Sequence, residues 1–149
     1  MLAGRPAVIE FIYSTLNALG YHHPIHPLST HIPMGMVIGG FLFAAVSLKW
    51  KTLDKTAYYC LILALVNVPI AIILGFLDWQ HFYNGNANPY ITAKIVLAAG
   101  LTILLALYVV LHRKGTVNNN LLMVLYFLSF LTVIGLGYCG GQLVFGGGT

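Results

Sequence analysis

Histidine is the residue type in this chain with the clearest chemical use, and its positions are clustered. Four of the six histidines lie close together near the amino terminus: His22, His23, His26 and His31. A fifth, His81, follows Asp78 by three positions. Imidazole is the commonest protein ligand for transition metals and also binds the iron of haem. These residues are therefore candidate ligands for a metal or a haem group.

A b-type haem takes one axial histidine from each side of its plane, so the two ligands should come from different segments. His26 or His31 from the first segment and His81 from the second meet this requirement, with His23 in reserve. Aromatic residues that suit a large apolar cofactor lie in both regions: Phe41, Phe43, Phe76, Trp79, Phe82 and Tyr83. The pattern favours haem b over a bare metal ion.

Three further residues have expected roles around such a haem. Asp78 would orient a ligand imidazole by accepting its hydrogen bond, and Trp79 would pack at the rim of the site. Lys94 would lie beside a haem propionate. A quinone could approach the same histidines for proton-coupled electron transfer.

Two other interpretations of the histidines stay open. A copper or zinc ion could use His22, His23 and His26, with Met34 and Met36 as soft neighbours for copper. Any single histidine could also be an interfacial, hydrogen-bonded residue without a ligand, because imidazole is stable at the depth of the lipid headgroups.

Composition decides which kind of fold positions these residues. The 149 residues are 59% hydrophobic and only 7% charged, and the mean hydropathy is +0.87. Soluble domains are about 25% charged, so too few charges are present to cover a globule in water. A water-soluble monomer is excluded, and most of the chain must lie in lipid.

Four apolar segments are long enough to cross a bilayer as helices, at about residues 32–48, 57–77, 91–111 and 121–138. Short connections between them predict antiparallel neighbours. We therefore expect one all-α integral membrane domain over residues 1–149, with an up-down four-helix bundle at 23–146. Residues 1–22 are expected to hold a short interfacial helix, at about 6–19. Pro69 should loosen the second span near Asn67, and the Gly35 to Gly39 spacing predicts close helix packing.

Basic residues predict the orientation of the bundle. The loops after the first and third spans carry five of the seven Lys and Arg residues: Lys49, Lys51, Lys55, Arg113 and Lys114. The positive-inside rule places these loops in the cytoplasm. Both termini, the loop at about residues 78–90, and five of the six histidines then lie on the outer side.

Three ordered motifs resemble a known family. They are His23-Pro24-Ile25-His26-Pro27 with Ile32-Pro33-Met34-Gly35, then Gly75-Phe76-Leu77-Asp78-Trp79, and finally Tyr138-Cys139-Gly140-Gly141-Gln142-Leu143-Val144-Phe145-Gly146. They resemble the HPIHP and FPIG, GxxDW and GGELVY segments of the four-helix bacterial membrane family catalogued as domain of unknown function 2231. The resemblance covers residues 23–146 and implies a bacterial inner-membrane domain with a cytochrome-like role, sometimes found beside redox proteins.

This chain departs from the family pattern at three places. The histidine of the third family helix has no counterpart within residues 96–100, Gln142 replaces an acid, and Ile32 replaces Phe. If the missing histidine is a cofactor ligand in the family, this chain must use another, and His31 and His81 are the candidates.

These observations favour a small membrane electron carrier, or a cytochrome-like subunit of a respiratory complex, rather than a stand-alone enzyme. Lipid, other subunits and periplasmic redox proteins are its expected partners. A non-catalytic subunit that anchors a larger membrane assembly is the alternative, and a copper or zinc protein is the third possibility. No nucleic-acid binding is expected, because the basic residues mark the ends of apolar spans.

Overall fold

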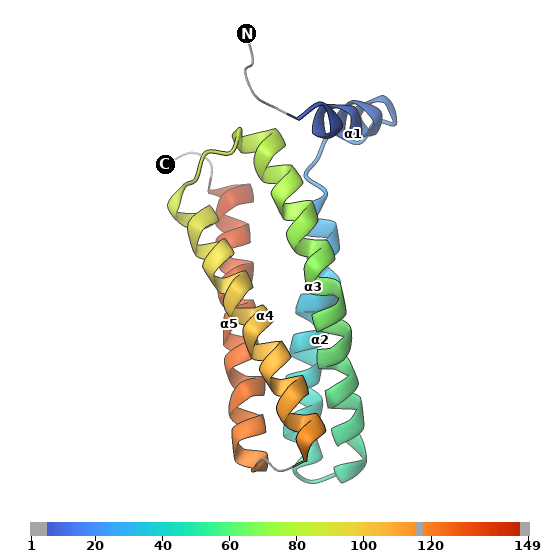
Figure 1. Ribbon diagram of the computed structural model, residues 1–149, viewed down its shortest axis with the longest axis vertical. Coiled ribbons are helices and arrows are strands. Elements are labelled where there is room, and N and C mark those ends of the chain that lie inside the picture. The colour runs from blue at the N-terminus through green and yellow to red at the C-terminus, as the bar shows by residue number, and fades with distance from the viewer. Residues whose placement is uncertain (1–5, 116–117, 147–149) are drawn as a thin grey trace.

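A computed structural model of the protein describes residues 6–115 and 118–146, and in these ranges the regular structure is entirely helical. The elements in chain order are α1 (Ala7–Ala18), α2 (His26–Ser47), the short 3-10 helix η1 (Lys51–Leu53), α3 (Asp54–Tyr83), α4 (Pro89–Lys114) and α5 (Asn119–Phe145). In Figure 1 the helices α2 to α5 run alongside one another as an up-down bundle, and α1 lies across one end. The all-α fold and the short amino-terminal helix are confirmed.

All four predicted spans correspond to helices that are long and apolar enough to cross a membrane. Every helix is longer than its predicted span; α2, for example, starts at His26 rather than near Ile32. Apolar segments mark only the hydrocarbon depth, whereas a helix continues into the polar region as long as its backbone bonds are satisfied. The histidine-rich segment is therefore partly helical.

Two prolines lie inside helices without ending them. α3 continues through Pro69, and α2 continues through Pro33. Asn67, near the expected loosening, donates its side-chain amide to the carbonyl of Leu63 at 2.8 Å. Membrane helices tolerate proline because neighbouring groups can satisfy the carbonyl that loses its partner.

Asparagine and glycine residues set the helix ends. The Asn88 side chain accepts a hydrogen bond from the Ile91 amide at 2.8 Å, and Pro89 occupies the first turn, where its missing N–H is not needed. Asn84 ends α3 with φ of 51°, and Gly85 follows with φ of 72°. These left-handed residues turn the chain from α3 into α4.

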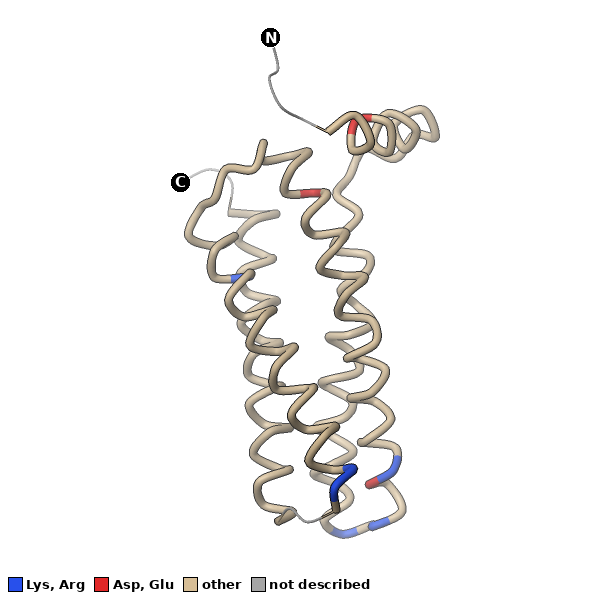
Figure 2. Tube along the Cα trace, viewed as in Figure 1, with Lys and Arg blue, Asp and Glu red and all other residues tan. Residues whose placement is uncertain are grey.

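The buried apolar core is concentrated in one half of the bundle. All four long helices contribute, through Val37, Ala44, Ala57, Leu61, Ala64, Val68, Leu101, Leu105, Tyr108, Val109, Leu125, Tyr126 and Val133. These core residues lie in the middle of the bundle and toward one of its ends. At that end α2 and α4 finish and α3 and α5 begin. Five basic residues mark that end, hereafter the basic end: Lys49, Lys51, Lys55, Arg113 and Lys114 (Figure 2).

The opposite end carries α1, the start of α2 and the end of α3, and we call it the histidine end after His22, His23, His26 and His81. Its outer surface is apolar, as on the rest of the bundle, with Phe76 at 50% exposure and Val96 at 65%. Exposed apolar faces on every long helix are what lipid as solvent requires. The protein is therefore a multi-pass membrane protein.

Helix α1 contacts the bundle through one face. Ile9 and Tyr13 are buried, whereas Val8 and Phe11 on the other side are 68% and 71% exposed. An amphipathic helix that exposes bulky apolar residues is suited to the membrane interface. The exposure of Val8 and Phe11 supports the predicted interfacial position of α1, which stays a prediction.

Candidate functional site

Asp78 is the centre of the polar contacts at the histidine end. It lies in the last turns of α3 and is only 6% exposed. Its Oδ1 accepts a hydrogen bond from the Ile25 amide at 3.1 Å, and its Oδ2 accepts one from the His26 amide at 2.8 Å. A buried carboxylate is stable only with such donors, and a helix N-terminus provides both free N–H groups and a positive dipole. Asp78 thus anchors the start of α2 to the end of α3.

Tyr13 joins α1 to the same carboxylate. Its hydroxyl donates a hydrogen bond to Asp78 Oδ1, and its ring stacks on His81 with centroids 3.8 Å apart and planes 8° apart. Phe82 packs edge-on against both rings. Burial, followed by the nearby Asp78 carboxylate, raises the pKa of Tyr13 above its ordinary value of 10.0. The hydroxyl therefore stays protonated and remains a donor at neutral pH.

His26 has a fixed ring orientation. Its Nδ1 lies 2.8 Å from the carbonyl oxygen of Ala71, and because a carbonyl can only accept, Nδ1 must carry the proton. The ring lies against Gly75, where an added Cβ would be 2.9 Å from Nδ1. In the neutral ring the other nitrogen, Nε2, carries the lone pair, and no described residue forms a hydrogen bond with it. In this neutral form His26 has an available ligand atom.

Lys94 is a partly buried cation in the same half of the bundle. It lies near the start of α4, apart from the basic residues of the other end (Figure 2). Its Nζ is 3.8 Å from the position of a Cβ at Gly140 on α5, and its charge acts on both His26 and Asp78. No ion pair joins it to any described residue. A cation in this position would favour an anionic group nearby.

The other expected site residues are more dispersed. His22 hydrogen-bonds to Asn17 at 2.9 Å, His23 lies edge-on to Tyr21, and His31 is exposed on α2. Trp79 donates to the Asn86 carbonyl at 2.9 Å and so closes the α3 to α4 turn. Thus the structure brings together His26, Asp78 and, through Tyr13, His81, with Lys94 within electrostatic reach.

For a copper or zinc site, three closely placed ligands would be expected. Among the described residues no group of three His, Cys, Asp or Glu side chains could hold a metal ion. Met34, one of the expected soft ligands, lies against the α5 backbone, with its Cε 3.3 Å from a Cβ built at Gly137.

Sequence reasoning missed two parts of this site. Tyr13 is the one tyrosine of the amphipathic segment at residues 7–18. The only sequence feature that indicates its burial is its spacing of four residues from Ile9, which places both side chains on one face of the helix. Gly75 appears in the sequence as the first residue of the GxxDW motif, one turn before Asp78. That spacing puts Gly75 and Asp78 on the same face of α3, which is the face that receives the start of α2.

The helices and the polar centre at one end define a four-helix, multi-pass membrane protein with a short amino-terminal helix. A family model described as predicted membrane protein, domain of unknown function 2231, matches residues 22–149. The chain belongs to this family. No curated protein and no solved structure shows significant similarity to it. Helix α1, which supplies Tyr13, precedes the matched region.

Proposed function

We propose that this protein is a membrane electron carrier that binds a b-type haem at the histidine end, with His26 as an axial ligand. The observation that carries the proposal is the Nδ1 to Ala71 hydrogen bond of 2.8 Å, which leaves Nε2 free to bind iron. Metal-binding histidines usually donate their second ring nitrogen to such an acceptor, because the bond fixes the tautomer and the orientation of the ring.

Neighbouring residues fit a haem in the same place. Asp78 fixes the first turn of α2 and hence the position of His26. Lys94 supplies a positive charge without an ion-pair partner among the described residues, which suits a propionate. His81 is the proposed second ligand, because Tyr13 and Asp78 connect it to His26. When bound, the haem would supply reversible one-electron chemistry at its iron.

The packing of the bundle supports this location. The main core cluster lies in the middle and toward the basic end, while small residues of α5 face the histidine half, with Gly137 against Met34 and Gly140 near Lys94. Cofactor sites in helical bundles form between facing helices where side chains leave room.

We propose that the protein lies in the bacterial inner membrane with its basic end in the cytoplasm, following the positive-inside rule. Both termini and the histidine end would then face the periplasm. Redox proteins of that compartment, a quinone, or other subunits of a respiratory complex would exchange electrons with the haem.

A visible absorption spectrum of the purified protein tests the haem proposal. Expression in a bacterial host supplied with a haem precursor should give a reduced-minus-oxidised difference spectrum with the α-band of b-type haem, and a pyridine haemochrome. His26→Ala should remove most of the bound haem, whereas His22→Ala, at an exposed residue before α2, should retain it. Absence of both spectral signals from correctly folded protein would refute the proposal.

A second candidate function is that of a non-catalytic subunit in a larger membrane assembly. Gly35 and Gly39 on α2 have open space where a Cβ would lie, so this GxxxG face is not used for packing against the described residues. Such faces allow close approach of another membrane helix. Co-purification of stoichiometric subunits without any chromophore would favour this function over the first.

A further inference from the structure

A polar cavity lies at the basic end, away from the histidine end. Its volume is about 260 Å³, and residues of α2, η1, α3, α4 and α5 line it. Three of its polar residues are more than nine-tenths buried: Ser47, Tyr108 and Tyr126 are 6%, 1% and 3% exposed. Polar side chains buried this deeply at the edge of a membrane need hydrogen-bonding partners.

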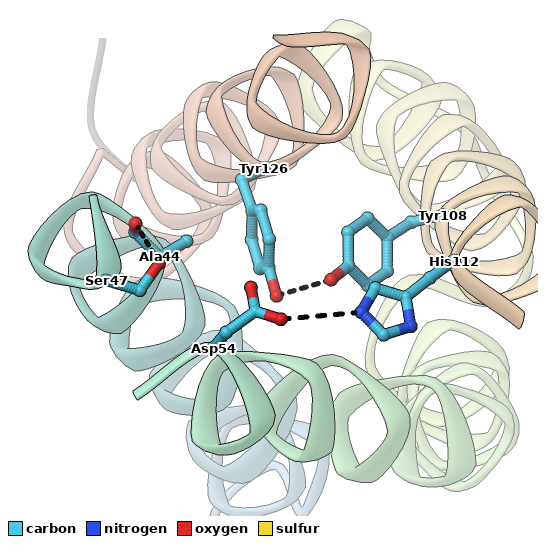
Figure 3. A network of polar contacts seen from close by, with 6 residues as sticks. All are labelled: Ala44, Ser47, Asp54, Tyr108, His112 and Tyr126. Carbon is cyan, nitrogen blue, oxygen red and sulfur yellow. Dashed lines mark hydrogen bonds and ion pairs between the residues drawn. The ribbon is translucent and has the colours of Figure 1, made fainter. Parts of the chain in front are cut away.

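The two tyrosines leave one donor unused. Their hydroxyl oxygens are 2.7 Å apart, so one hydroxyl donates to the other and the second retains its hydrogen. No described residue accepts that hydrogen. Figure 3 shows both hydroxyls pointing into the same space, beside the carboxylate of Asp54. Ser47 is already satisfied, because it donates to the Ala44 carbonyl at 2.8 Å. The cavity therefore presents a free O–H donor from the tyrosine pair.

Charged residues around the cavity limit the charge of the ligand that it can bind. Asp54 lines the wall and pairs with His112 at 3.9 Å, which disfavours an anion. Lys51 also lines the wall, as does Asn119 at the positive amino-terminal end of α5, and these disfavour a cation. An uncharged group with a hydrogen-bond acceptor fits both conditions.

The remaining wall is apolar. Leu48, Leu122 and Met123 face the cavity beside the two aromatic rings, and a methionine side chain adapts readily to a flat ligand. Pockets for drug-sized ligands measure about 300–1,000 Å³, so about 260 Å³ suits a single substituted ring or a small bicyclic head. The lining residues of α2, α4 and α5 belong to helices long and apolar enough to cross a membrane, so a ligand with an apolar tail in lipid suits this position.

We propose that this cavity binds the head of a lipid-soluble quinone, with a quinone carbonyl accepting the free hydrogen bond of the Tyr108 and Tyr126 pair. The apolar side chains hold the ring, and the tail extends into lipid. This site is distinct from the histidine end, where a quinone was expected from the sequence. It is a binding site that requires neither haem nor a redox step.

The two tryptophans provide a test, because quinones quench tryptophan fluorescence at short range. In the sequence Trp50 stands between two cavity residues, Leu48 and Lys51, whereas Trp79 lies at the histidine end. Purified Trp79→Phe protein, in which Trp50 alone reports, is titrated with decyl-ubiquinone. We expect saturable quenching of Trp50, and only linear, collisional quenching of Trp79 in the Trp50→Phe protein.

Tyrosine variants in the Trp79→Phe background test the hydrogen bond. Replacing both Tyr108 and Tyr126 by Phe should weaken the saturable binding at least fivefold, and Tyr138→Phe, at an exposed tyrosine of α5, should leave it unchanged. Linear quenching of both reporters, saturation of Trp79 instead of Trp50, or binding unaffected by the double substitution would overturn the proposal. If the double variant does not fold, the comparison of the two reporters still decides, and neither outcome depends on haem.

Discussion

The Oδ2 atom of Asp78 lies 2.8 Å from the backbone nitrogen of His26, 52 residues earlier in the chain. One carboxylate therefore fixes the first turn of α2, and with it the position of the imidazole proposed as a haem ligand. Because Tyr13 donates to the same carboxylate, three helices depend on one buried side chain.

Asp78→Ala should destabilise the protein by about 2–4 kcal/mol, because it leaves two amides and a tyrosine hydroxyl without their charged acceptor. Thermal unfolding in detergent would measure the loss. Asp54→Ala is the matched control, since the Asp54 side chain is 55% exposed, and it should cost less than about 1 kcal/mol. Equal effects of the two substitutions would contradict the role assigned to Asp78.

Gly75→Ala should displace the His26 ring, because the new Cβ would lie 2.9 Å from Nδ1. We expect a destabilisation of about 1–3 kcal/mol and a loss of haem from the proposed site. Unfolding curves and the haem to protein absorbance ratio would measure both effects. Gly100→Ala, where a Cβ meets nothing within 4 Å, should be neutral or slightly stabilising.

Docking of α1 should weaken at alkaline pH. Because the pKa of Tyr13 is raised in the folded protein above 10.0, the stabilisation from its protonated hydroxyl is complete below about pH 10 and declines as the pH rises beyond it. Limited proteolysis of the link between α1 and α2 should accelerate there. In the Tyr13→Phe protein the segment between α1 and α2 should be cleaved faster at pH 7 than in the unmodified protein. The further increase in cleavage rate at alkaline pH should be absent, because the titrating hydroxyl has been removed.

Lys94→Gln should lower the midpoint potential of the proposed haem, since removal of a positive charge stabilises the oxidised iron relative to the reduced iron. It should also weaken haem retention through loss of the propionate partner. Redox titration followed at the α-band measures the potential. Lys55→Gln at the basic end is the control, and an unchanged potential in Lys94→Gln would place the haem away from α4.

Much of the fold followed from the sequence because the physical signals are strong. Apolar segments bounded by charged residues or by Gly, Pro and Asn placed all four long helices, and antiparallel connectivity correctly brought the start of α2 beside the end of α3. The predicted positions of the helix ends were less accurate. The first six residues of α2, His26 to His31, include polar residues and precede the apolar span, so hydropathy does not reveal that they are helical.

The details of the site depended on tertiary contacts that no local pattern contains. Asp78 was expected to accept from a ligand imidazole, but it accepts from the backbone of His26, while the imidazole itself bonds to Ala71. Tyr108 and Tyr126 lie inside apolar spans and resemble ordinary core residues. That their hydroxyls meet depends on the register of α4 against α5, which the sequence pattern leaves open.

The unequal distribution of the core has a consequence for the order of assembly. Because the densely packed cluster lies in the middle and toward the basic end, the four helices can associate there while the histidine half still opens and closes. The proposed haem could then be inserted late, from the histidine end, into a bundle that is already assembled. Hydrogen exchange should accordingly be slowest around Leu61 and Leu105 and should slow near Ala71 only after the cofactor has bound.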